Sequence, residues 1–413
     1  MRTERNGQRW RVGVVAAAAM LMAGGVSAQT VTTDRPAGYI VFPKIVSDPS
    51  GLFTGGVAVD TLIQITNTNS SGPRAAHCFF VDGTSRCSNG ASEIDPDGAC
   101  RDNKDCNPGG VCRLATCQGE NFDILMTANQ PIGWLASEGV LQENICQGGS
   151  QTGFGCDDDT DCPGGSCVVL NIGRIPPLSP GVFQGELKCV ESAQPSAPTV
   201  TPLPLNANDL IGNATIYRVL GGTGTSQVDV RQYNAIGLQS VLNDGALQSD
   251  IELQLGGAGA EYAGCPAQLI VNHFFDNAQV GTNTSVVTNL TFVPCSERLE
   301  SDPDPVPTQL QFLVYNEFEQ RFSASTGLSC FRTLQMSNID RRAGQESTSI
   351  FNVAVQGTLA GQTVVRPVLS SITPQEGNGV LAIAEEFYST GRSTAYNINL
   401  RGTKSQADWV LYQ

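Results

Sequence analysis

The chain has 413 residues, of which only 15% are charged, with 45 glycines, 14 cysteines and a formal net charge of −15. This negative balance argues against nucleic acid and anionic membrane surfaces as partners, because both attract clusters of Lys and Arg. Low charge together with abundant Val, Thr, Ser, Asn and Gly is typical of an all-β protein.

The N-terminus, residues 1–28, has the pattern of a secretory signal peptide. Four Arg precede an apolar run over residues 12–26, which ends in the small-residue exit Val26-Ser27-Ala28. This run is too short to span a bilayer comfortably. Cleavage after Ala28 removes the four Arg and Glu4, so the remaining 385 residues carry a charge of −18. We therefore expect a secreted, periplasmic or extracellular protein with no membrane span after cleavage.

Short apolar runs bounded by turn residues recur along the rest of the chain, which is typical of strands. In residues 310–315 the even positions are consistently apolar, as a strand with one buried face requires. Runs this short and numerous favour β-sandwiches. The predicted strands are residues 39–45, 61–66, 75–81, 122–127, 168–171, 183–190, 210–219, 228–233, 251–255, 268–275, 286–293, 310–315, 329–335, 350–355, 363–368, 380–387 and 395–400.

Two pairs of segments resemble each other across the chain. Residues 210–219 resemble residues 359–368, and residues 61–67 resemble residues 310–316. Two interpretations are open: a duplicated domain, or the chance likeness of amphipathic strands. From the first interpretation we expect two Ig-like β-sandwich domains, at residues 29–250 and 251–413.

Cysteine clusters account for much of the extra length of the first domain. The spacings are Cys100-x5-Cys106-x5-Cys112 and Cys156-x5-Cys162-x4-Cys167, each with an Asp-Cys pair, a Pro and a Gly-Gly pair. Both clusters fall between the segments at 61–67 and 210–219, so they are predicted to be loop insertions at about 82–119 and 146–167. Long loops are tolerated at modest entropic cost, and disulfides would order them.

The second cluster, Cys156-Asp-Asp-Asp-Thr-Asp-Cys162-Pro-Gly-Gly-Ser-Cys167, resembles short cysteine-rich repeats of uncharacterised secreted proteins from environmental bacteria. The likeness covers about 20 residues in each copy, roughly a tenth of the chain. The first copy departs from the pattern, with Lys104 at an acidic position and Asn107 before its Pro. The resemblance implies export and disulfides, and it implies no activity.

The even number of cysteines favours a fully paired framework in an exported protein. We expect a Cys265–Cys295 bridge between neighbouring strands and a Cys78–Cys117 bridge at the base of the first insertion. Spacing alone leaves the remaining connectivity open. A zinc site is the alternative, but the chain lacks the Cys-x2-Cys pairs that zinc sites prefer. The predicted disulfide cysteines are Cys78, Cys87, Cys100, Cys106, Cys112, Cys117, Cys146, Cys156, Cys162, Cys167, Cys189, Cys265, Cys295 and Cys330.

Asp157, Asp159 and Asp161 stand at alternate positions, which resembles the start of a calcium loop. The segment departs from the EF-hand pattern, since Cys162 replaces the glycine at position six and Val168 the glutamate at position twelve. Two interpretations are open: weak calcium binding, or a solvated acidic turn held by disulfides.

Candidate catalytic groups are scarce. The two histidines, His77 and His273, lie in strand-like runs, and a Ser-His-Asp site would have to use one of them. The acidic pairs Glu317/Glu319 and Glu385/Glu386 offer the two carboxylates of a glycosidase but are not diagnostic. Trp134 and Trp409 are candidates for a carbohydrate platform or for core aromatics.

These patterns favour a secreted, non-enzymatic surface, adhesion or interaction protein, whose partner is a protein or glycan at a cell surface. Stapled loops projecting from a rigid scaffold are suitable contact sites. The alternative is an extracellular carbohydrate-active enzyme or a lectin-like binder. Calcium is the one cofactor that the sequence suggests.

Overall fold

The computed structural model describes residues 31–403, with internal gaps. The gaps are residues 52, 55, 91, 93–98, 101–103, 114, 116, 141–144, 153–155, 157, 169–174, 179–180, 195–200, 221–226, 258, 297–298, 300–307, 342–343 and 369–378. The expected signal peptide at residues 1–28 therefore lies outside the described residues, as does Trp409.

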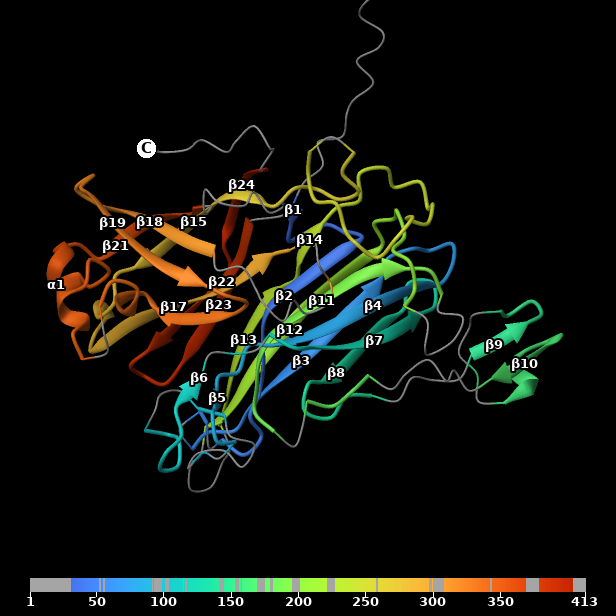
Figure 1. Ribbon diagram of the computed structural model, residues 1–413, viewed down its shortest axis with the longest axis horizontal. Helices are drawn as coiled ribbons and strands as arrows, with labels where there is room; N and C mark the ends of the chain where they lie inside the picture. The colour runs from blue at the N-terminus through green and yellow to red at the C-terminus, as the bar shows by residue number, and fades with distance from the viewer. Residues whose placement is uncertain are drawn as a thin grey trace, which may run out of the picture.

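Antiparallel strands dominate the described part of the chain, as its composition predicts (Figure 1). The first half of the chain builds two of the larger sheets. One is six-stranded, with the spatial order β1 (Val31–Thr32), β14 (Ile236–Leu238), β2 (Tyr39–Ser47), β11 (Phe183–Ser192), β4 (Arg74–Asp82) and β7 (Gly119–Met126). The other is four-stranded, with the order β13 (Gln227–Asn234), β12 (Leu210–Leu220), β3 (Val59–Asn67) and β8 (Pro131–Leu135).

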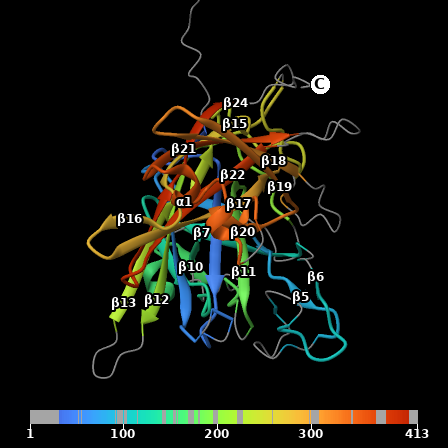
Figure 2. The ribbon, with the colours of Figure 1, turned by 90° about the vertical axis from the view of Figure 1, so that its left-hand side faces the viewer.

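The second half of the chain builds two further sheets. One has the order β19 (Arg321–Leu328), β18 (Thr308–Asn316), β21 (Ala360–Val368), β15 (Pro266–Phe274) and β24 (Asn399–Thr403). The other has the order β16 (Ala278–Gly281), β17 (Thr284–Cys295), β22 (Gly379–Tyr388) and β23 (Ser393–Asn397), with β20 (Arg332–Gln335) also paired to β17. Figure 2 shows the orange and red strands of this half facing the viewer.

Three apolar cores join these sheets. The first lies between the six-stranded and four-stranded sheets and includes Phe42 and Ile63. The second lies on the opposite face of the six-stranded sheet, where Phe79 belongs to the same cluster as Leu381 of β22. The third joins the two sheets of the second half and includes Phe312. Because β2 reads as a near-continuous apolar run, it can be buried on both faces of its sheet.

The prediction of two Ig-like sandwich domains is wrong. The four larger sheets are arranged as a four-blade, β-propeller-like ring. Independent Ig-like domains would each leave the outer faces of their sheets to solvent, whereas the six-stranded sheet has a core on both faces. The ring also brings β13 of the first half beside β23 of the second, where Asn234 and Asn397 are hydrogen-bonded.

The predicted strand at residues 350–355 is also wrong, because a turn of α-helix, α1 (Val353–Gln356), occupies its end. The Asn352 side chain accepts a hydrogen bond from Ala354 N at 2.9 Å, which is an N-cap contact. Gly357 ends the helix in the left-handed conformation, with φ +68°. Other helical structure in the described residues consists of the 3-10 turns Asp159–Asp161, Met336–Asn338 and Glu346–Thr348.

The resembling segments occupy corresponding places in the two halves. β3 pairs with β12, and β18 pairs with β21. At the end of β3, Asn67 Oδ1 accepts from Asn69 N, and at the end of β18, Asn316 Oδ1 accepts from Phe318 N. The same strand pairing and the same asparagine turn support the interpretation of a duplication.

Candidate interaction surface

Two small disulfide knots extend from the ring of sheets. We call residues 86–113 the first knot and residues 145–168 the second knot. In both, the first cysteine bonds the third and the second bonds the fourth. The bridges are Cys87–Cys106 and Cys100–Cys112 in the first knot, and Cys146–Cys162 and Cys156–Cys167 in the second.

The knots also share their backbone. In the first knot, β5 (Arg86–Cys87) pairs with β6 (Cys112–Arg113), so that the first and fourth cysteines are strand partners. In the second knot, β9 (Ile145–Gly148) pairs with β10 (Gly165–Val168), and Cys146 faces Cys167 in the same way. The knots are therefore two copies of one structural unit.

The Pro-Gly-Gly segments form the same turn in both knots. Gly110 N donates to Asn107 O at 2.9 Å, and Gly165 N donates to Cys162 O at 2.8 Å. The middle glycine of each segment has positive φ, +91° at Gly109 and +80° at Gly164. Pro at the second turn position and Gly with positive φ at the third are the signature of a type II turn. The repeated sequence motif therefore encodes a repeated turn.

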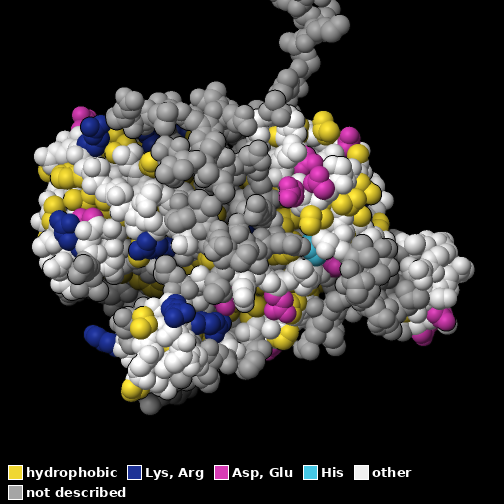
Figure 3. Space-filling view, in the orientation of Figure 1, with side chains coloured by type: hydrophobic (Ala, Val, Ile, Leu, Met, Phe, Trp, Pro, Cys, Tyr) yellow, Lys and Arg dark blue, Asp and Glu magenta, His cyan; other side chains and the backbone are white. Residues whose placement is uncertain are grey.

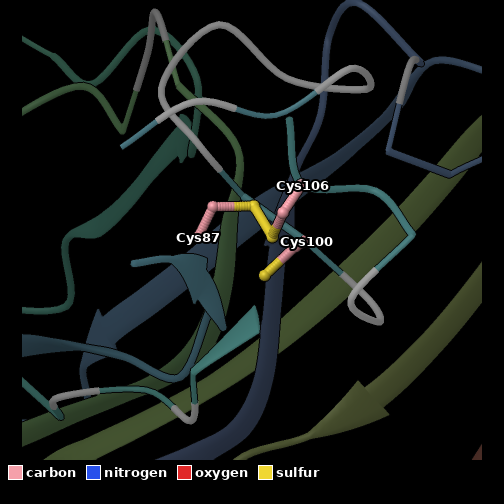
Figure 4. A group of neighbouring side chains, drawn as sticks. All are labelled: Cys87, Cys100 and Cys106. Atoms are coloured by element: carbon pink, nitrogen blue, oxygen red, sulfur yellow. A yellow bond between two sulfur atoms is a disulfide. The ribbon is translucent and has the colours of Figure 1, made fainter. Parts of the chain in front are cut away.

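Cystines fill the interior of both knots. Cys87, Cys100 and Cys106 form a small buried cluster in the first knot, which Figure 4 shows. Their sulfur atoms, like those of Cys146, Cys156 and Cys162 in the second knot, lie within 4.8 Å of one another. All of these cysteines are in disulfides, and metals bind the thiolate form of cysteine. As bonded here, the clusters are not metal sites.

The first knot is fixed to the second half of the chain. Cys117, at its base, bonds Cys330 across a sequence separation of 213 residues. Gly83 packs beside Phe331, and a Cβ at position 83 would lie 2.4 Å from the Phe331 Cβ. The first knot therefore has a short, rigid attachment at the junction of the two halves.

The predicted Cys78–Cys117 bridge is wrong. Cys78 of β4 instead bonds Cys189, its direct neighbour on β11. The predicted Cys265–Cys295 bridge is confirmed. All 14 cysteines are paired, which agrees with the prediction of a disulfide framework.

The second knot is attached through a narrow neck. Val140 N donates to Ile175 O at 3.2 Å, and Ile175 N donates to Val140 O at 3.0 Å, so the two ends of the insertion lie side by side. In Figure 1 β9 and β10 project beyond the strands of the ring. This knot has a buried cluster of its own, made of cystines, and none of its described residues belongs to the three large cores.

The exposed surfaces of the two knots differ in charge, and the first knot also exposes Val111. Lys104 and Arg113 are exposed on the first knot, whereas Asp158, Asp159 and Asp161 are exposed on the second. Figure 3 shows Lys and Arg side chains gathered over the first knot and acidic side chains at the end of the second.

The aspartates of the second knot support its fold. Asp158 caps the 3-10 turn Asp159–Asp161 by accepting a hydrogen bond from Thr160 N at 2.7 Å. Hydrogen bonds from the Thr160 hydroxyl and from Thr160 N lower the pKa of Asp158. Asp159 Oδ1 accepts from Cys167 N at 2.6 Å, and Asp161 Oδ2 accepts from Asp158 N. Asp157 lies outside the described residues. Of the three aspartates considered for calcium, the two described ones therefore bind backbone amides of their own knot.

Both histidines lie in the sheets. His77 Nδ1 is 2.6 Å from Asp123 Oδ1, its cross-strand neighbour on β7. His273 contacts Phe274 O and Thr363 Oγ1 and is fully buried, which lowers its pKa to about 4. Neither histidine has a serine hydroxyl among its hydrogen-bond partners in the described chain, so no Ser-His-Asp arrangement is formed.

The remaining catalytic candidates lie in the core or take part in turns and hydrogen bonds of the fold. Trp134 is 3% exposed and packs edge-on against Phe122 in the first core, so it offers no carbohydrate platform. Glu317 accepts from Ala360 N, and Glu319 has the positive φ of a turn residue. Glu386 accepts a hydrogen bond from the Tyr388 hydroxyl.

A buried charge cluster joins three sheets, and the sequence reasoning missed it. Glu385 of β22 lies 2.5 Å from Lys44 Nζ of β2 and 3.1 Å from Arg231 Nε of β13. Burial alone raises the pKa of Glu385, but the two cations outweigh it and the net pKa is lowered. The sequence signal for this cluster is Lys44, a charged residue that follows Pro43 inside an otherwise apolar strand and so requires a buried partner of opposite charge. The register of β2 and β11 shifts at this point, which identifies a β-bulge.

Among the described residues, no helix has the length and apolar character of a membrane span. No protein-family model matches the chain, and no curated protein matches it.

Proposed function

We propose that the chain is a secreted, non-enzymatic surface or interaction protein whose two disulfide knots contact a protein or glycan partner. The observation that carries this proposal is the duplicated knot, with a cystine interior and charged side chains on its exterior. Seven disulfides and the absence of a membrane-spanning helix among the described residues are consistent with an extracellular protein. The N-terminal pattern of residues 1–28 supplies the route of export.

The division between ring and knots supports a contact role. The ring has its own extensive cores, and the second knot shares none of its described residues with them. Disulfides reduce the freedom that a loop loses on binding, and this preorganisation favours affinity. Loops on a rigid scaffold commonly carry binding functions.

The test removes the second knot without disturbing its neck. Since Val140 and Ile175 are antiparallel neighbours, an Asn-Gly turn can replace residues 141–174. Labelled wild-type and shortened proteins are added to the surface of the cells that secrete them, and bound protein is measured by flow cytometry. The matched control, Thr152→Ala, alters an exposed knot residue and leaves the disulfides in place.

We expect the shortened protein to keep the β-type circular dichroism spectrum of the wild type and to lose most surface binding. The control should bind like the wild type. Equal binding by the shortened protein, and by a second variant with Lys104→Ser and Arg113→Ser in the first knot, would exclude the knots as contact sites.

A further inference from the structure

β19 is a long edge strand with no proline, bulge or interior charge, and the Arg332 side chain covers only its Gly327 end. It forms one margin of the five-stranded sheet β19-β18-β21-β15-β24 and covers eight residues, Arg321–Leu328, with no proline and a single charged residue at its start. Its register with β18 is continuous, without a bulge. Edge strands of this kind are templates for strand addition, and natural proteins usually block them.

The backbone of β19 presents hydrogen-bonding groups outward. Asn316 N donates to Gln320 O just before β19 begins. Because the direction of the main-chain groups alternates along a strand, the N–H and C=O groups of the even-numbered residues of β19 point towards β18. Gly327 O accepts from Arg332 Nη1 at 2.5 Å, which identifies the odd residues as outward-facing. Ser323 and Ser325 are exposed, and their main-chain N–H groups have no partner in the described part of the chain.

Three other edges in the ring, those of β13, β8 and β7, have visible protection. The Asn397 carboxamide occupies the edge of β13 by bonding both Asn234 N and Asn234 O. β8 is short and begins at Pro131, and β7 carries Glu120 and Asp123. Short strands, proline and charge are known means of blocking an edge.

The C-terminal segment, residues 404–413, has the composition of a strand that could pair there. It follows β24 and contains Trp409, Val410 and Tyr412, which are residue types enriched in strands. β24 is the opposite margin of the same sheet, four strand spacings or about 19 Å from β19. Ten residues reach at most about 35 Å, so a segment that first crosses the sheet has only a few residues left to pair. The whole of β19 is therefore accessible only to the segment of another copy.

We propose that the edge of β19 binds residues 404–413 of a second copy of this chain as an added strand. Main-chain hydrogen bonds to Ser323 and Ser325 would supply affinity, as in other cases of β-strand addition. Donor and acceptor are different surfaces, so each bound copy leaves one free edge and one free segment. Such heterologous contacts build rings or open chains of copies.

The test compares self-association of the full-length protein with that of three variants, by sedimentation velocity over a range of concentrations. One variant ends at Thr403. Ser325→Pro removes an outward N–H, which an edge strand tolerates, and Ser325→Thr is the matched control that keeps it. A labelled peptide of residues 404–413 is also titrated onto the variant that ends at Thr403, with a Val410→Pro peptide as its control.

We expect the full-length protein and the Ser325→Thr variant to self-associate and the truncated protein to be monomeric. Loss of one edge hydrogen bond should weaken association of Ser325→Pro by about tenfold. The peptide should bind the truncated protein, and its proline form should not. Association that survives truncation, or a full-length protein that is monomeric at every concentration, would overturn the proposal. This test uses no knot variant, so its outcome is separate from that of the proposed function.

Discussion

Asn397 binds the backbone of Asn234 from both sides: its Oδ1 accepts from Asn234 N at 2.9 Å, and its Nδ2 donates to Asn234 O at 2.7 Å. A side chain of β23 thus takes the place that a neighbouring strand would have beside β13. The contact joins residues 163 positions apart and links the two halves of the chain.

We expect Asn397→Ala to lower the free energy of unfolding by about 1–3 kcal/mol, because two hydrogen bonds across the halves are lost. Asn397→Asp is the matched control, since it keeps the acceptor and removes the donor, and its loss should be intermediate. Urea unfolding followed by circular dichroism measures the change. A loss below about 0.5 kcal/mol for Asn397→Ala would mean that water replaces the carboxamide.

Breaking the buried pair of Lys44 and Glu385 should be strongly destabilising. Lys44→Met leaves Glu385 with one cation fewer in a site where the carboxylate is fully buried, and we expect a loss of about 3–5 kcal/mol. The double variant Lys44→Met with Glu385→Gln should recover part of that loss. A double-mutant cycle in urea tests this, and additive losses would show that the two side chains do not interact.

The Cys117–Cys330 bridge should matter more than its shorter relatives. It closes a loop of 213 residues, so replacing both cysteines with Ala should cost about 2–5 kcal/mol in the chain-entropy model. The control replaces Cys265 and Cys295, whose separation is only 30 residues, and should cost less. Thermal unfolding of both oxidised variants supplies the comparison, and an inverted order would count against the entropic explanation.

Acid should destabilise the protein through His273. Its pKa is about 4 in the folded state and about 6.5 when unfolded, so the unfolded state binds more protons between these pH values. The contribution of neutral His273 to the free energy of unfolding is complete above pH 6.5. It is lost as the pH falls towards 4, and the loss is at most about 3 kcal/mol. His273→Gln, which keeps a polar partner for Thr363, should flatten this part of the curve. Parallel pH dependence in both proteins would refute the assignment.

Calcium should leave the melting temperature unchanged, within about 1 °C. The described carboxylates Asp159 and Asp161 already accept hydrogen bonds from backbone amides, and an ion would compete with these contacts. Calorimetry with excess calcium and with chelator measures the shift. A rise of several degrees with calcium that is abolished by Asp159→Asn would restore the calcium-loop interpretation.

Individual strands could be predicted from the sequence because alternation is a local property. Leu310, Phe312 and Val314 are buried as their spacing in β18 requires. Residues 350–355 were mistaken for a strand because they are rich in β-branched side chains, while the Asn352 cap and Gly357 favour a helical turn. Alternation identifies the buried face of a strand but not the sheet that packs against it. The ring arrangement could therefore not be predicted from alternation.

The two knots could be predicted as units, whereas the bridge that fixes the first knot to the second half of the chain could not. The repeated Pro-Gly-Gly signal and the similar cysteine spacing identified two related stapled insertions. The Cys117–Cys330 bridge depends on tertiary contact between distant segments, for which spacing carries no information. Lys44 and Glu385, 341 residues apart, were equally beyond reach.

In each knot the two disulfides overlap along the sequence, so a protease that cuts the knot once does not release a fragment. Between Cys146 and Cys167, a single backbone cut at any position is spanned by at least one disulfide, because the bridge from Cys146 ends beyond the start of the bridge to Cys167. The same holds between Cys87 and Cys112. Exposed loop tips are the preferred sites of nicking. A nicked knot would keep both of its fragments attached, so the protein could retain its outermost segments in a protease-rich medium.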